Sequence, residues 1–158
     1  MTTTQLSIIN PPPQGCPVRL ASTVTDIESQ VDNRLRFQDG INIHISCHQV
    51  DRRTARVYLW VTWQMDEGGP RCTSRYDEDD IQDVDPGLLY AYWKEKGGRY
   101  EATRLDVYHV YAILDQHYGS YLVQWIGFDE TELTWETTRK INNICPAAVI
   151  EWKRCKTT

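Results

Sequence analysis

The feature that most constrains the fold of this chain is an internal repeat. The stretch IQDVDPGLLYAYWK at 81–94 aligns with INNICPAAVIEWK at 141–153. In both, two aliphatic residues flank a polar pair, a proline follows two positions later, and an aromatic residue stands six positions after the proline. Upstream, Trp63 matches Trp125 at an offset of 62, whereas the prolines match at 60. One small module therefore occurs twice, and each copy of roughly 50 residues is near the lower limit of what folds alone.

Local patterns predict the same elements in both copies. In the first, strand-like INIHI and VYLWVTW are joined by DRRTAR, and a polar loop DEGGPRCTS and an acidic run YDEDDIQDVD follow. A helix begins at Pro86 and ends at Gly97-Gly98. In the second, strands at 108–114 and 120–125 and a short strand LTWE precede a helix that begins at Pro146. The predicted fold class is α+β and mostly β, with two small modules that are each a curved three-stranded antiparallel sheet packed by a C-terminal helix.

Composition predicts the domain boundaries. The first residues contain a Thr triplet and three consecutive prolines, which favours a flexible arm over 1–25. We expect a first module at 26–97, a linker at 98–105, a second module at 106–154 and a tail at 155–158.

Charge and cysteine usage narrow the class of protein. The net charge of -5 argues against binding duplex nucleic acid through phosphate neutralisation and is compatible with a basic partner. The five cysteines are odd in number and form no C-x-x-C pair, which predicts reduced thiols in an intracellular protein and no metal site. No apolar run approaches the ~20 residues that span a bilayer, so no membrane partner is expected.

Nothing in the sequence predicts catalysis. The four histidines have no G-x-S-x-G, H-E-x-x-H or P-loop motif beside them, and the acidic residues lie in a run instead of a spaced pair. We therefore expect a protein that is not an enzyme and that has no cofactor.

The chain is rich in aromatic residues suited to recognition surfaces, with six Trp and nine Tyr against two Phe. On the strand SYLVQW, Tyr121, Val123 and Trp125 share one face. Packing in a core, together with Trp135, Val149 and Trp152, is the ordinary interpretation of such rings. Trp125 and Phe128 differ because they flank a glycine at the end of a strand, where rings can project around a void.

The second copy resembles a chromodomain, the module of the heterochromatin-protein and Polycomb families. The resemblance covers about 106–154 and is carried by YHVYAILD, YLVQWIGF, TWE and a helix that begins at a proline and ends in an aromatic residue. Members of the family bind a methylated lysine of a histone tail. The resemblance implies an aromatic cage of Tyr108, Trp125 and Phe128, an adjacent acid at Glu132, and Trp135 in the core.

Cation–π attraction explains why a cage suits this ligand, since a trimethylammonium group keeps its charge but has lost its hydrogen-bond donors. The resemblance also implies that the peptide lies as a strand between two segments of the module. The expected residues of this clasp are Val107, Val110, Glu136, Lys140 and Asn142. The chain departs from the family pattern at four positions, which are Val107, Leu133, Thr137 and Lys140.

The first copy, at about 41–97, is a degenerate chromodomain-like or chromoshadow-like repeat. Aligning Asp51 with Asp115 places His44 at the position of Tyr108 and Asp66 at that of Phe128. We therefore expect no methyl-lysine binding there. The copy is open to three interpretations: pairing with another chromatin protein or with itself through a helix, presentation of the acidic run to a basic partner, or simple burial of that helix and solvation of the run. The interaction helix would use Leu89, Tyr92 and Trp93.

The function that these patterns favour is a non-enzymatic chromatin reader of the nucleus, which binds a methylated histone tail through the second module. The alternatives are a dimerisation or assembly subunit with a vestigial cage, and a single-stranded RNA binder, which the acidic charge disfavours. The sequence leaves open which histone lysine is bound, its degree of methylation and the complex that the protein serves.

Overall fold

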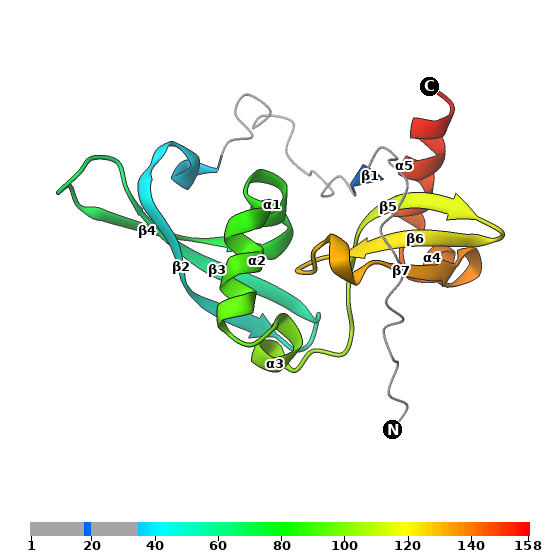
Figure 1. Cartoon of the computed structure of the whole chain (residues 1–158), viewed down its shortest axis with the longest axis horizontal. Helices are drawn as coiled ribbons and strands as arrows, with labels where there is room; N and C mark the ends of the chain where they lie inside the picture. The colour runs from blue at the N-terminus through cyan, green and yellow to red at the C-terminus, as the bar shows by residue number, and fades with distance from the viewer. Residues whose placement is uncertain (1–17, 20–34) are drawn as a thin grey trace. The chain divides into compact units, whose positions relative to one another are not determined.

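The computed structural model describes residues 18–19 and 35–158, which form two compact units (Figure 1). One unit contains 35–108, and the other contains 18–19 and 109–158. Each unit is an antiparallel sheet followed by helices, so the predicted mostly-β, α+β fold with two small modules is confirmed. In the described part of the chain, no helix is long and apolar enough to cross a membrane.

The first unit has a three-stranded sheet of order β2-β3-β4. The predicted loop at 66–74 is partly strand, because β4 begins at Arg71, and the acidic run forms a helix, α1, instead of a solvated loop. Acidic residues fill the first turn of α1, where the helix dipole favours them. The elements are η1 (Arg36–Asp39), β2 (Ile41–Asp51), β3 (Arg56–Gln64), β4 (Arg71–Asp77), α1 (Glu78–Val84), α2 (Pro86–Glu95) and α3 (Arg99–Thr103).

The second unit has a four-stranded sheet of order β1-β5-β6-β7. The extra strand β1 pairs with β5, so the predicted arm at 1–25 is not wholly flexible; the rest of it lies outside the described residues. The predicted tail is also corrected, because the last helix continues to Lys156. The elements are β1 (Val18–Arg19), β5 (Val110–His117), β6 (Ser120–Trp125), η2 (Glu130–Glu132), β7 (Thr134–Thr137), α4 (Thr138–Ile144) and α5 (Pro146–Lys156).

Strand register confirms the internal repeat. In the first sheet Tyr58 pairs with the last residue of β4, and in the second sheet Ser120 pairs with the last residue of β7. Tyr58 and Ser120 are therefore equivalent, and so are Trp63 and Trp125, which each lie five residues further along. Each sheet is followed by a seven-residue helix and then, after one non-helical residue, by a helix that begins with proline. The linking residues Asp85 and Cys145 share φ −151° and have ψ of 73° and 68°. A residue before proline is kept out of the helical region, which explains this break.

The first strands of the two sheets align differently from the sequence-based expectation. His44 pairs with Thr62 as Ala112 pairs with Gln124, so His44 matches Ala112 and not Tyr108. The alignment of Asp51 with Asp115 is therefore wrong. β2 and β5 also share register shifts at matching places, and such bulges bend a strand and curve the sheet.

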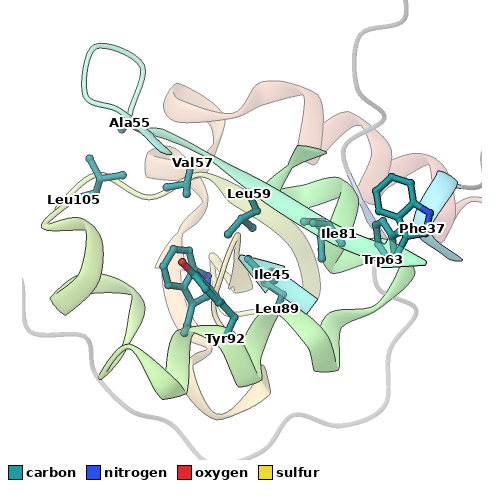
Figure 2. Packing of buried hydrophobic residues seen from close by; sticks show 12 residues of the cluster. Phe37, Ile45, Ala55, Val57, Leu59, Trp63, Ile81, Leu89, Tyr92 and Leu105 are labelled. Atoms are coloured by element: carbon teal, nitrogen blue, oxygen red, sulfur yellow. The ribbon is translucent and has the colours of Figure 1, made fainter. Parts of the chain in front are cut away.

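The core of the first unit lies between the sheet and α2 (Figure 2). Leu89, Tyr92 and Trp93 are 0%, 6% and 3% exposed, so the predicted interaction helix uses these residues in its own core and does not present them to a partner. The Tyr92 hydroxyl and His48 Nδ1 are hydrogen-bonded at 2.7 Å. This contact links β2 with α2, and the second unit links β5 with α5 in the same way, because Trp152 Nε1 donates to Gln116 Oε1 at 3.2 Å.

A buried ion pair attaches α3 to the first unit. Arg99 donates to both oxygens of Glu78 at 2.8 Å, and Trp93 Nε1 donates to the same carboxylate at 2.8 Å. Arg52 adds a hydrogen bond to the carbonyl of Thr103 at 3.0 Å. Residues 98–105 are therefore part of the first unit and not a linker.

In the second unit, the central strand β6 is buried on both faces. Leu122 packs with Ala112, Leu114 and Leu133, and Trp135 lies against this cluster. The helices α4 and α5 contribute Ile141, Val149 and Trp152, all at most 2% exposed. The predicted core roles of Trp135, Val149 and Trp152 therefore agree with their packing.

Candidate aromatic cation site

A tight turn at the end of β6 brings Trp125 and Phe128 together. The Phe128 N–H donates to the Trp125 carbonyl at 3.1 Å, which closes the turn. Gly127 has φ +86°, a conformation that glycine adopts without strain. The W-x-G-F spacing in the sequence is thus the signature of a turn that places two aromatic side chains three residues apart.

Both rings are buried in the ligand-free chain. Trp125 is 4% exposed and Phe128 is 9% exposed. The expectation that these rings project around an open void is therefore not met. A ligand that uses their faces has to displace side chains that cover them.

A chain of hydrogen bonds fixes the indole of Trp125. Its Nε1 donates to Thr134 Oγ1 at 2.9 Å, and the Thr134 hydroxyl donates to Glu136 Oε1 at 2.8 Å. The ammonium group of Lys140 binds the other oxygen of Glu136 at 2.6 Å. The ring orientation of Trp125 is thus set by β7 and by the first turn of α4.

The same lysine brings a positive charge to the ring. Lys140 Nζ lies 5.9 Å from the centroid of Trp125, within the range of cation–π attraction. Its side chain is 44% exposed, whereas that of Glu136 is 16% exposed. The family resemblance implies a peptide clasp for Lys140 and Glu136 and does not predict this arrangement, although their i, i+4 spacing is the usual signal of an ion pair.

The predicted cage acid Glu132 ends the short helix η2. Asp129 begins this helix and accepts a hydrogen bond from the Thr131 N–H at 2.8 Å. Burial, and then the charge of Asp129, raises the pKa of the Glu132 carboxyl above its ordinary value. Glu136 is the anion that hydrogen bonds connect to Trp125, through the Thr134 hydroxyl.

Tyr108, the third predicted cage residue, is the last residue of the first unit and is half-buried. The next residue belongs to the second unit, where the His109 carbonyl accepts a hydrogen bond from the Ile126 N–H at 2.9 Å. His109 and Ile126 therefore form a hydrogen-bonded pair, and Val110 and Trp125 form the next pair along the strands. Because hydrogen-bonded and non-hydrogen-bonded pairs alternate along antiparallel strands, the N–H and C=O groups of Val110 point away from β6. Val107 is 56% exposed.

The other side of the predicted clasp needs correction. Lys140 and Asn142 lie on α4, where the main chain is hydrogen-bonded within the helix, so neither offers a strand edge. The Thr138 N–H donates to the Gly119 carbonyl. Every second residue of an antiparallel strand faces the same neighbour, so the N–H and C=O groups of Glu136, two residues earlier, also point towards β6. On β7 it is Trp135 whose main-chain groups face the outer edge.

The first unit fills the corresponding position with its own side chains. Trp63 is 1% exposed and has Phe37 and Tyr76 beside it, at centroid distances of 6.4 and 6.5 Å. A Cβ atom on Gly40 would lie 2.4 Å from Trp63 Cδ1, so no larger residue fits there. Asp66, which matches Phe128, is exposed. Phe37 is the residue that the sequence analysis missed, because it lies upstream of the recognised repeat.

The first unit also holds an acidic cluster at the start of α1. One carboxylate oxygen from each of Asp77, Asp79 and Asp80 lies within 4.8 Å of the others. Burial, and then the charge of Asp79, raises the pKa of Asp77. The four cysteines in the described part of the chain carry free thiols.

No protein-family model, curated protein or solved structure matches this chain.

Proposed function

We propose that the second module binds a methylated lysine of a histone tail, and that the protein is a non-enzymatic chromatin reader of the nucleus. The observation that carries this proposal is the ammonium group of Lys140 at the ring of Trp125. An alkylammonium group thus already has a place beside this ring in the ligand-free chain. A methylated lysine of a partner presents the same kind of group with a larger apolar surface.

The aromatic residues supply the attraction. A cation over the face of an aromatic ring gains about 0.5 to 2 kcal/mol, depending on how far it is desolvated. Trp125 is held by its indole hydrogen bond, and Phe128 is held three residues away by the Gly127 turn. Such fixed rings bind without the entropy cost of ordering them. The chromodomain resemblance implies Tyr108 as a third ring, but Tyr108 belongs to the first unit, so the proposal rests on Trp125 and Phe128 of the second.

Peptide main chain would add to the affinity by strand addition. Trp135 directs its main-chain groups to the outer edge of β7, the last strand in the order of the described sheet, which suits an added extended segment. The first module is not the reader in this proposal, because Phe37 and Tyr76 already pack beside Trp63.

The proposal is tested with the full-length protein and histone-tail peptides that differ only in lysine methylation. We expect methylated peptides to bind and unmethylated ones to bind at least about tenfold more weakly, since two or more rings contribute. Phe128→Ala should weaken binding at every salt concentration. The matched control is Tyr118→Ala, which removes a ring that is 95% exposed in the same unit.

Melting curves separate binding from folding. If Phe128→Ala lowers the melting temperature but leaves the affinity of the folded protein unchanged, the ring serves packing and the proposal fails. The remaining interpretations are then a dimerisation or assembly role with a vestigial cage and single-stranded RNA binding. Failure of every methylated peptide to bind wild-type protein leads to the same conclusion.

A further inference from the structure

The carboxylate of Glu136 has both oxygens engaged in the ligand-free chain. Oε1 accepts a hydrogen bond from the Thr134 hydroxyl at 2.8 Å, and Oε2 binds the Lys140 ammonium at 2.6 Å. The same hydroxyl accepts from the indole of Trp125 at 2.9 Å. The Glu136 carboxylate, which these hydrogen bonds connect to Trp125, is therefore paired with a lysine of the protein itself.

The ion pair between Glu136 and Lys140 bears on the degree of methylation that the site prefers. A monomethyl- or dimethyl-lysine keeps N–H donors and gains most where a carboxylate is free to accept them. A trimethyl-lysine has no donor and depends on ring faces and charge alone. While Lys140 is paired with Glu136, its charge weakens that carboxylate as an acceptor for the N–H donors of the lower methylation states.

We propose that Lys140 is the residue that sets methylation preference, and that it makes the site selective for trimethyl-lysine over monomethyl-lysine. The inference rests on the proposed function. Lys140 acts in two ways, because it occupies Glu136 and because its positive charge repels every cationic ligand. Removing the charge should therefore tighten binding of all methylated lysines, and should favour the lower methylation states most.

The experiment uses the full-length protein and Nα-acetyl-lysine amide in its four methylation states, titrated while the indole N–H resonance of Trp125 is followed by NMR. These probes have no flanking sequence, so only the side-chain site is measured. The variants are Lys140→Gln and Lys153→Gln. Both remove one positive charge from an exposed helical position, but Lys153 lies on α5 and not on the α4 turn that holds Glu136.

For the wild type and for Lys153→Gln we expect trimethyl-lysine to bind at least about fivefold more tightly than monomethyl-lysine. For Lys140→Gln we expect that ratio to fall to about twofold or less, with tighter binding of both. Adding Glu136→Gln to Lys140→Gln should restore the trimethyl preference, because the acceptor charge is gone.

Three results would overturn the inference. If trimethyl-lysine shifts the Trp125 resonance but the two lysine variants show the same ratio, the proposed function stands and the role of Lys140 is refuted. If Glu132→Gln instead of Glu136→Gln controls the ratio, the wrong anion has been assigned. If no probe shifts Trp125 in any variant, the proposed function fails and the inference fails with it.

Discussion

The buried ion pair of the first module gives a prediction that is independent of any ligand. Arg99→Met removes the guanidinium but keeps a long apolar side chain. Of the two residues that donate to the Glu78 carboxylate, Trp93 and Arg99, only Trp93 then remains. The side chains of Arg99 and Glu78 are 2% and 3% exposed, so water does not replace the lost contacts. We expect the first module to lose a large part of its stability.

The magnitude follows from burial. Breaking a buried ion pair by removing one partner costs about 3–5 kcal/mol, because an uncompensated charge remains. A module of this size has a total stability of only about 5–10 kcal/mol. For such a small domain 1 kcal/mol corresponds to a shift of about 4–8 °C in melting temperature, so the variant should melt at least about 12 °C lower.

A matched control lies at the end of the same helix. Arg104→Met breaks the pair with Glu101, whose atoms are 3.0 Å apart but whose side chains are 62% and 55% exposed. Exposed pairs contribute about 0–1 kcal/mol, so this variant should unfold close to the wild type. Urea unfolding of the full chain, followed by the indole NMR signal of Trp93, measures both. Equal midpoints for the two variants would refute the reasoning about burial.

Three further predictions concern rings. Phe37→Ala should destabilise the first module by about 3–5 kcal/mol in urea unfolding, because a ring that is 1% exposed packs beside Trp63; a loss below about 1 kcal/mol would show that the site collapses around the cavity. Burial, with smaller effects from Cys47 and Glu95, raises the pKa of Tyr92 to about 12. Since the unfolded state ionises near pH 10, stability should be full below that pH and fall as the pH rises towards 12, a loss that Tyr92→Phe should remove. Trp125→Phe should cost about 1 kcal/mol of stability through the lost Thr134 hydrogen bond and weaken binding of methylated peptide, whereas unchanged binding would exclude Trp125 from the site.

The parts of the fold that the sequence predicts are those with a local chemical cause. The two prolines begin α2 and α5. The aligned aromatic residues Tyr92 and Trp152 are hydrogen-bonded to the corresponding strands β2 and β5. The repeat in the amino-acid sequence is therefore also a repeat in side-chain packing. The short helices α1 and α4 were missed because seven residues before a proline carry little periodicity, although the acidic first turn of α1 is a recognisable signal.

The parts that sequence does not predict depend on long-range contacts. The β2–β3 hairpin is longer than the β5–β6 hairpin, because pairing continues to Asp51 and Arg56 in the first unit and stops at His117 and Ser120 in the second. Matching His44 to Tyr108 from the sequence is therefore wrong. Gly97-Gly98 predicts the end of a helix and the start of a linker, but Arg99, which follows them, is buried in the first unit. The pairing of Lys140 with Glu136 is visible in the spacing, but its position at the Trp125 ring depends on how β7 lies beside β6.

The most direct test of the cation account compares two ligands of nearly equal shape. The histone peptide that binds most tightly is prepared once with trimethyl-lysine and once with its uncharged carbon isostere, tert-butyl norleucine. If the rings of Trp125 and Phe128 hold a cation, the charged peptide should bind at least about fivefold more tightly, because the isostere keeps the apolar area and loses only the charge. Equal affinities would contradict the account and assign these rings to hydrophobic packing.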